Sequence, residues 1–285
     1  MLAAHMDEVG LMVKKIEDTG FLRLSPIGGI EPTIISGQTA KIIDLKGRVL
    51  CNGVITFGEI HDASEIKVPP KMDYLYVDTG LSPKELAKKG IEIGTYVIPD
   101  NKFQTLGNKK IISGKALDDR IGCYMLIEIA KKLKNYKNLN IYYVFTVQEE
   151  IGLYGAKTSV YEINPDWGIA VDVTVASDSD IKKGTPIGSG AYMTVKDSEI
   201  IANPELDHHI EMIAKKHKIP LILEVADFGT TDATNIMLSK RGVPSTIIGV
   251  PVRNIHSTIS VAHMDDITAA INLMVEVLKN PPKHL

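Results

Sequence analysis

The pattern of apolar residues changes near residue 103, and this change constrains the fold more than any other feature of the sequence. Beyond it, short apolar runs alternate with segments in which apolar residues recur with a period of 3.6. Such alternation is typical of a sheet with helices on its faces. The run at 139–147 is rich in β-forming residues, and it is predicted to be a central strand buried on both faces. Further strands are predicted at 167–173, 221–225 and 245–250, and helices at 121–133, 204–216, 231–240 and 264–279.

Residues 10–103 have a different pattern, with short β-type runs separated by Gly, Pro and Asp. A single helix is expected after Ser82, with Pro83 in its first turn and Glu85 closing a capping box. Strands are predicted at 11–13, 22–24, 40–43, 49–55, 74–77 and 95–98. This composition favours a small β-barrel.

A strand is already under way at residues 2–5, before the β-rich segment begins. We therefore predict an α/β fold: a mixed sheet with helices on both faces, formed by residues 1–9 and 104–285. An inserted small β-barrel domain at 10–103 interrupts it.

The bulk composition excludes several classes of partner. The net charge of −3 comes from 35 acidic and 32 basic residues mixed along the chain, so no nucleic-acid partner is predicted. No apolar stretch is long enough to cross a bilayer, and the first residues lack the features of a secretory signal. The two cysteines are far apart in the sequence and form no metal-type pair. A cytoplasmic protein without a membrane partner is expected.

The chemistry is expected where the predicted strands end, because open α/β sheets bind ligands beyond the carboxyl ends of their strands. The polar residues at five such places, including a helix entrance after 116–117, are His5 with Asp7, Asp118 with Asp119, Glu149 with Glu150, Asp172, and His256. One acidic residue alone would be read as a helix cap. The convergence of the whole set favours a functional site.

Imidazole and carboxylate ligands of this kind suit two divalent cations, zinc or cobalt, with manganese as the alternative. Five ligands serve two cations if one carboxylate bridges them, and such a pair can activate a water molecule. Glu149 and Glu150 can divide the remaining work, because neighbouring residues at a strand end point in different directions. One would bind a cation and the other would face the water.

Asp7 has a separate expected role. At a spacing of two on an extended segment, His5 and Asp7 share one face, so Asp7 is predicted to orient the imidazole rather than bind a cation. His263 is the main rival of His256, because Ala262-His-Met-Asp265 echoes Ala4-His-Met-Asp7. We interpret the echo as coincidence, since it stands where a helix is predicted to begin.

Seven segments then occur in the order seen in one known family. They are Ala-Ala-His-Met-Asp-Glu-Val-Gly at 3–10, Pro-Ile-Gly-Gly at 26–29, Lys-Ala-Leu-Asp-Asp-Arg at 115–120, Thr-Val-Gln-Glu-Glu-Ile-Gly at 146–152, Ala-Val-Asp-Val at 170–173, Thr-Asp-Ala at 231–233 and Pro-x-Arg-x-x-His-Ser at 251–257. Over essentially its whole length the chain resembles the tetrahedral, or TET-type, metallo-aminopeptidases of peptidase family M42. Some members of that family carry the label endoglucanase.

The resemblance implies a role for each site residue. His5 and Asp172 would hold one cation, Glu150 and His256 the other, and Asp118 would bridge them. Glu149 would be the general base, and Asp7 would orient His5.

The resemblance also implies an architecture and an assembly. The inserted domain would mediate dimer formation, and the dimers would build a hollow dodecamer. Two departures stand out: Arg-Asn-Ile-His at 253–256 differs from the family pattern, and the family's N-terminal helix and first strands have no counterpart before residue 1. A chain lacking that segment is expected.

The expected function is metal-dependent removal of N-terminal residues from short peptides through a water activated by two cations. One alternative is a glycoside hydrolase, which requires two carboxylates and leaves the histidines unexplained. A second is a related two-metal deacylase or carboxypeptidase, because the same cations would cleave any amide. A third is an assembled but inert shell-forming protein.

Overall fold

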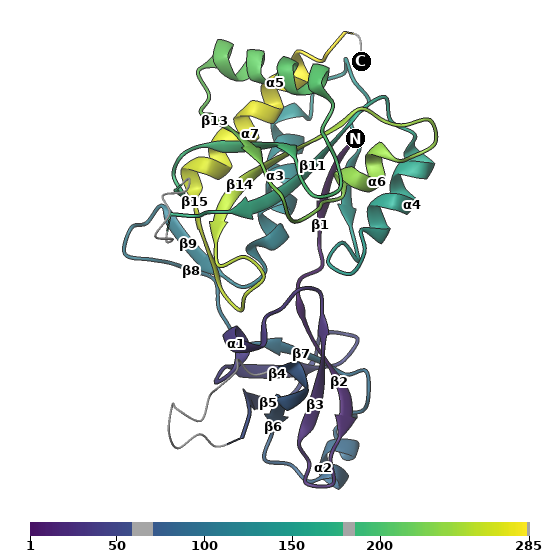
Figure 1. The fold of residues 1–285 in the computed structure, drawn as a ribbon, viewed down its shortest axis with the longest axis vertical. Helices are drawn as coiled ribbons and strands as arrows, with labels where there is room; N and C mark the ends of the chain where they lie inside the picture. Colours follow the sequence, from purple (N-terminus) through teal and green to yellow (C-terminus); the bar gives the residue numbers. More distant parts are fainter. Residues whose placement is uncertain (59–70, 179–185, 284–285) are drawn as a thin grey trace. The chain divides into compact units, whose positions relative to one another are not determined.

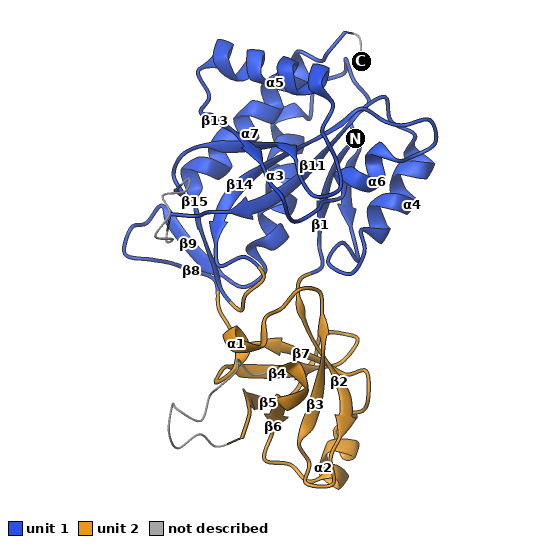
Figure 2. Ribbon diagram, viewed as in Figure 1, with its two compact units in different colours: residues 1–7, 103–255, 259–285 blue, residues 8–102, 256–258 orange. Residues whose placement is uncertain are grey.

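The computed structural model describes residues 1–58, 71–178 and 186–283. The chain divides into two compact units (Figure 2). Unit 1 comprises residues 1–7, 103–255 and 259–285, and unit 2 comprises residues 8–102 and 256–258. The sheet domain is therefore discontinuous in sequence, as is the barrel unit, which takes up the short segment 256–258.

Unit 1 is built on a nine-stranded mixed sheet (Figure 1). Seven strands form one path in the order β10-β1-β11-β14-β15-β9-β8, and β12 pairs with β14 and β13 beside it. Strands β10, β1, β11 and β14 are mutually parallel, and the β14–β15, β15–β9, β8–β9 and β12–β14 pairs are antiparallel. The strands are β1 Leu2–His5, β8 Gln104–Thr105, β9 Ile111–Gly114, β10 Tyr143–Thr146, β11 Gly168–Val175, β12 Ala191–Lys196, β13 Leu221–Val225, β14 Ser245–Arg253 and β15 Ser260–His263.

Alternate residues of β1 show how the sheet is covered on both faces. Leu2 and Ala4 belong to the core that includes residues of α3, α5 and α7, whereas Met1 and Ala3 pack in a smaller core that includes Val160 of α4. Successive side chains of a strand point to opposite faces, so helices cover both sides of the sheet. The helices are α3 Leu117–Leu133, α4 Tyr154–Ile163, α5 Pro204–His217, α6 Ala233–Met237 and α7 Met264–Lys279.

Unit 2 contains a closed barrel of strands in the order β2-β3-β6-β5-β4-β7. Alternate residues such as Leu11, Val13, Leu22 and Leu24 fill its interior, each at most 2% exposed. Closing the sheet leaves no unpaired edge along these strands. The elements are β2 Gly10–Ile16, β3 Leu22–Ile27, α1 Pro32–Ile35, β4 Thr39–Ile43, β5 Val49–Thr56, η2 Met72–Tyr74, β6 Tyr76–Asp78, α2 Pro83–Lys88 and β7 Tyr96–Pro99.

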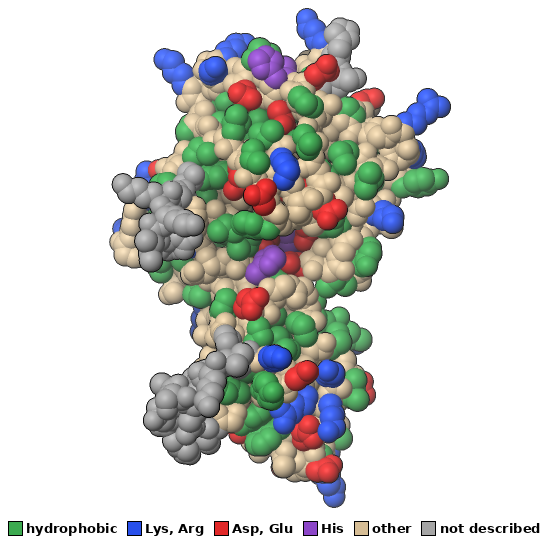
Figure 3. Space-filling view, in the orientation of Figure 1, with side chains coloured by type: hydrophobic (Ala, Val, Ile, Leu, Met, Phe, Trp, Pro, Cys, Tyr) green, Lys and Arg blue, Asp and Glu red, His purple; other side chains and the backbone are tan. Residues whose placement is uncertain are grey.

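The predicted fold class, a mixed α/β sheet with helices on both faces and a small β-barrel, is confirmed. The helix after Ser82 forms as expected, and the Glu85 carboxylate accepts a hydrogen bond from the Ser82 amide at 2.9 Å. Both cysteines are free thiols. No described helix has the length and apolarity that a membrane crossing requires. On the face drawn in Figure 3, acidic and basic side chains lie interspersed.

Some expected elements are wrong in place or length. The run at 139–147 yields only β10, which pairs with β1 alone among the described strands and is partly exposed, so it is not central. An apolar run reports what a segment can bury, but its position in the sheet depends on its partners. The helix expected at 231–240 is the five-residue α6, and α4 was not anticipated.

Candidate metal centre

Three neighbouring parallel strands of unit 1 bring polar residues to one place: β1 and β10 end there, and β11 passes it three residues before its end at Val175. His5 is the last residue of β1 and pairs with Thr146, the last residue of β10. The β1–β11 register matches Ala3 with Ala170, and its continuation by two residues brings His5 level with Asp172. Parallel strands therefore place this histidine and this aspartate together, as the positions of ligands in open α/β sheets predict.

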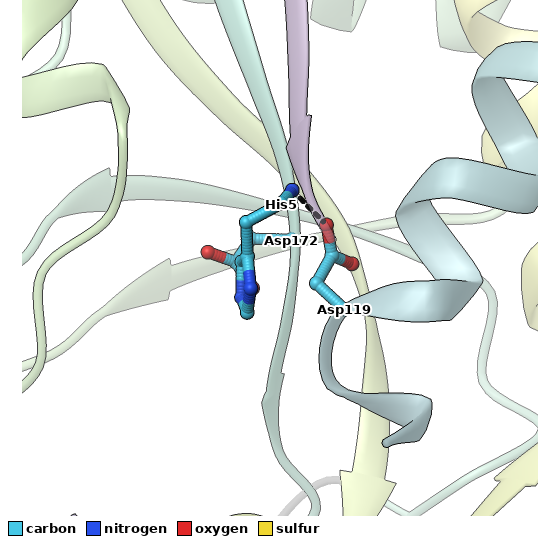
Figure 4. A group of neighbouring side chains, drawn as sticks. All are labelled: His5, Asp119 and Asp172. Carbon is cyan, nitrogen blue, oxygen red and sulfur yellow. Dashed lines mark hydrogen bonds and ion pairs between the residues drawn. The ribbon is translucent and has the colours of Figure 1, made fainter. Parts of the chain in front are cut away.

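The entrance of α3 supplies two more carboxylates to the same place. Asp118 and Asp119 have non-helical backbone angles, φ −82° and ψ 109° and φ −117° and ψ 41°, and the peptide bond between them is cis. Figure 4 shows His5, Asp119 and Asp172 converging from β1, the start of α3 and β11. All of these side chains are buried, and Asp119 is fully buried.

The imidazole of His5 is the centre of the cluster. Its Nε2 lies 3.0 Å from Oδ1 of Asp118, 3.8 Å from Oε2 of Glu149 and 3.9 Å from Oδ1 of Asp172. Two groups of three residues could each hold a cation: His5 with Asp118 and Glu150, and His5 with Asp119 and Asp172. Within each group, the potential ligand atoms all lie within 4.8 Å of one another. Nitrogen and carboxylate oxygen atoms at this spacing fit a divalent cation such as zinc.

Asp119 is engaged with the backbone, whereas Asp118 faces the imidazole. Oδ2 of Asp119 accepts a hydrogen bond from the His5 amide at 3.1 Å, and Oδ1 accepts one from the Gly122 amide at 2.9 Å. A Cβ at position 122 would lie 2.3 Å from Oδ2 of Asp119, so only glycine leaves room there. Asp119 thus ties the end of β1 to α3, which favours Asp118 as the residue that offers oxygen to a cation.

Asp7 contacts the two glutamates through their backbone. Its Oδ1 accepts a hydrogen bond from the Glu149 amide and its Oδ2 one from the Glu150 amide, both at 3.2 Å. Nδ1 of His5 lies 3.1 Å from the Asp7 carbonyl oxygen and 3.7 Å from its carboxylate. A proton on Nδ1 donated to this carbonyl leaves Nε2 as the metal-binding nitrogen, the usual arrangement of a ligating histidine. Asp7 is therefore placed to orient both His5 and the glutamates.

The cluster gathers several buried carboxylates around the imidazole of His5, and each group shifts the pKa of the others. Burial opposes protonation of His5, but Asp118, Asp172 and the other carboxylates outweigh it and raise the pKa of His5 to about 12. Burial raises the pKa of Glu149 to about 10, with Asp172 adding to the effect. Burial also raises the pKa of Glu150 and of Asp172 to about 8. Such a group of buried acids retains protons that a cation would displace, which is the electrostatic character of a metal site.

His256 lies in unit 2, within the segment 256–258. The Asn101 side chain donates a hydrogen bond to the Thr258 carbonyl at 2.9 Å and ties this segment to the barrel unit. A Cβ built on Gly29 would lie 3.0 Å from Nδ1 of His256, so the glycine at 29 gives the imidazole its room. His256 has a φ of 53°. His263, the rival, caps α7 instead: its Nδ1 accepts a hydrogen bond from the Asp265 amide at 3.1 Å.

Asp232 and Thr146 also lie in this region, and no role was predicted for them from the sequence. Asp232 is 3% exposed, and its Oδ2 accepts a hydrogen bond from the Thr146 hydroxyl at 2.5 Å. Burial raises the pKa of Asp232, and its charge in turn adds to the raised pKa values of Glu149 and Asp172. The Thr-Asp-Ala segment at 231–233 was the only sequence signal that pointed to it.

Comparison with known proteins agrees with this geometry. The family model described as M42 glutamyl aminopeptidase matches residues 1–273. The lysyl aminopeptidase of Pyrococcus furiosus is 36% identical over 284 residues, which cover 98% of this chain and 81% of that protein.

Solved structures lead to the same family. An aminopeptidase from the archaeon Desulfurococcus kamchatkensis has a TM-score of 0.92 at 37% identity, covering 98% of this chain and 78% of that one. The TET1 peptidase of Pyrococcus horikoshii, described as able to assemble into a tetrahedron or a large octahedral shell, has a TM-score of 0.85 at 30% identity, covering 97% and 82%. With the matched family model spanning nearly the whole sequence, the chain belongs to the M42 glutamyl aminopeptidase family.

Proposed function

We propose that this chain is a metal-dependent aminopeptidase that removes N-terminal residues from short peptides with a water activated by two divalent cations. The observation that carries the proposal is the buried cluster around Nε2 of His5, in which Asp118, Glu149 and Asp172 lie within 3.9 Å of that atom. Several carboxylates buried around one imidazole are costly in a protein interior, and cations would offset that cost.

The assignment of ligands follows the contacts and the family. His5 and Asp172 are proposed for one cation, Glu150 and His256 for the other, and Asp118 for the bridge. Support comes from the 3.0 Å separation of Nε2 of His5 and Oδ1 of Asp118, and from the mutual approach of His5, Asp118 and Glu150. The donor set contains imidazole and carboxylate and no thiolate, which suits zinc or cobalt, with manganese as the alternative.

When bound, the two cations would lower the pKa of a water molecule and polarise the scissile carbonyl group. Glu149 is proposed as the general base that takes the proton from the attacking water and passes it to the leaving amine. Its backbone amide donates to Asp7, as does that of Glu150. Asp7 therefore fixes the segment from which the two neighbouring carboxylates project in different directions.

The rival functions predict different behaviour. A glycoside hydrolase would use two carboxylates and would leave the buried His5 without a purpose. A two-metal deacylase or carboxypeptidase would share the site but would not require a free N-terminus on its substrate. An inert shell-forming protein would assemble and bind cations without turnover.

We expect a chelator to abolish hydrolysis of a panel of aminoacyl anilides, and added zinc, cobalt or manganese to restore it. Matched N-acetylated anilides should remain uncleaved, because an aminopeptidase needs the free amine. Release of the aniline chromophore measures both. Full activity after chelation, with cation removal verified by plasma emission, would contradict the proposal, and release of acetate from the acetylated substrates would favour the deacylase.

The barrel unit is proposed to carry subunit contacts of a dimer and, through dimers, of a larger shell. Assembly is supported by the TET1 peptidase of Pyrococcus horikoshii, whose match covers 97% of this chain and which is described as able to assemble into a tetrahedron or a large octahedral shell. The choice of the barrel as the contact surface follows the family resemblance.

Replacing residues 10–102 with a short Gly-Ser linker is expected to lower the oligomeric state to monomer, because the proposed contact surface is removed. Native mass spectrometry of this variant and of the intact chain measures the change. Circular dichroism serves as the control that the helices of unit 1 persist. An unchanged oligomeric state in a folded variant would rule out the barrel as the interface.

A further inference from the structure

The loop that carries Glu149 and Glu150 has an unfavourable backbone. Gln148 and Leu153 have positive φ angles of 61° and 58°, and Gly152 has a φ of 146°. Residues other than glycine rarely adopt such angles, and they persist only where surrounding structure holds them. Within the loop, the Glu149 carbonyl accepts hydrogen bonds from the amides of Gly152 and Leu153 at 3.0 and 2.9 Å. Contacts from outside the loop must supply the remaining interactions that hold these backbone angles.

The short helix α6 contacts this loop at both of its ends. At the start, the Thr146 hydroxyl donates to Oδ2 of Asp232 at 2.5 Å. At the far end, the Asn235 side chain donates to the Leu153 carbonyl at 2.7 Å. Asp232 and Asn235 lie within one turn of helix, so a single rigid element spans the segment between Thr146 and Leu153.

Asp232 does not cap the helix at whose start it stands. It occupies the N-cap of α6, where an aspartate normally accepts a hydrogen bond from the first turn, yet its side chain makes no capping bond. The Ala233 amide instead donates to the Thr231 hydroxyl at 3.2 Å. Oδ1 of Asp232 is buried and has no hydrogen-bond partner among the described residues. The carboxylate of Asp232 therefore contacts β10 and not its own helix.

Thr146 connects the same contact to the imidazole. It pairs with His5 in the β1–β10 register, and its carbonyl accepts a hydrogen bond from the Met6 amide at 2.9 Å. Its side chain is 2% exposed. The Thr146–Asp232 hydrogen bond therefore fixes the end of β10, which pairs with His5 on one side and leads into the loop at 147–153.

We propose that Asp232, through Thr146, and Asn235, through Leu153, are positioning residues that hold Glu149 and Glu150 in their working directions. The role in turnover rests on the proposed aminopeptidase function, whereas the holding of the loop does not. Outer residues that orient metal ligands contribute about 10–100-fold to affinity or activity, and this sets the size of the effect expected here.

The test compares Thr146→Val with Thr246→Val. Thr246 is fully buried on β14 and donates to Oδ1 of Asp207 at 2.5 Å, so it forms a second buried Thr–Asp pair, which joins β14 to α5 and not β10 to α6. Thr146→Val is expected to lower kcat about 10–100-fold with a smaller change in KM. Thr146→Ser, which keeps the hydroxyl, should restore most of the activity. Thr246→Val should lower the melting temperature but leave kcat unchanged.

A second readout does not depend on activity. Hydrogen exchange of the peptide that contains residues 147–153 should become faster in Thr146→Val and in Asn235→Leu, and should stay unchanged in Thr246→Val. Equal behaviour of the two valine variants in both kcat and exchange would overturn the proposal. Absence of any anilide cleavage by the unmodified protein would instead refute the proposed function, while the exchange result would still decide whether α6 holds the loop.

Discussion

Replacing Glu149 with glutamine is expected to lower kcat by ~10²–10⁴-fold, because the attacking water loses its general base. Both cations should stay bound, since glutamine keeps the shape of the side chain and no proposed ligand is removed. Steady-state rates on an aminoacyl anilide give the first quantity, and plasma emission on the desalted protein gives the second.

Glu150→Gln is the matched control, because it makes the same chemical change one residue away. It should lower the content of one cation, and excess metal should partly restore its rate. Loss of a cation in Glu149→Gln, with both retained in Glu150→Gln, would reverse the two roles. If neither variant changed rate or metal content, the two-metal site would lie elsewhere.

Asp118→Asn is expected to cause the larger loss of metal, because a bridging carboxylate serves both cations. Removal of an outer residue typically costs about 10–100-fold in metal affinity, and loss of a shared ligand should exceed that. Isothermal titration with zinc or manganese measures the affinity, and anilide hydrolysis follows its consequence for rate.

Asp119→Asn tests whether the two neighbouring aspartates have different roles. Asp119 accepts backbone hydrogen bonds at 3.1 and 2.9 Å from His5 and Gly122, so its replacement should disturb the end of β1 rather than remove a ligand. We expect a lower melting temperature and an affinity loss within the range of an outer residue. Greater loss of metal in Asp119→Asn than in Asp118→Asn would make Asp119 the bridge, in keeping with its approach to His5 and Asp172.

The neighbouring acidic pairs show where the sequence was ambiguous. Spacing alone did not say which of Asp118 and Asp119 faces the imidazole, because both precede the same helix. In the structure the two carboxylates have different partners. Asp119 accepts hydrogen bonds from two backbone amides, and Oδ1 of Asp118 lies 3.0 Å from Nε2 of His5. Residue type predicted the chemistry, but the backbone angles at 118 and 119 direct each carboxylate.

Asp7 and Asp232 illustrate contacts that cross long sequence distances. Asp7 was expected to orient His5, two residues away in the sequence. Its carboxylate accepts hydrogen bonds from the backbone amides of Glu149 and Glu150 as well. Asp232 contacts Thr146, 86 residues earlier in the chain. No periodic pattern encodes such pairs, because they depend on which strand ends are neighbours.

The sequence by itself determined the fold class, the barrel as an element distinct from the sheet, and the residue types that gather at the strand ends. Local pattern suffices for these because burial and backbone preference act along the chain. Only the tertiary structure decided that β10 pairs with β1 alone among the described strands, and that α6 contacts both ends of the loop at 147–153. Those features arise from pairing and packing between distant segments, whose free energy depends on all partners at once rather than on any one stretch of sequence.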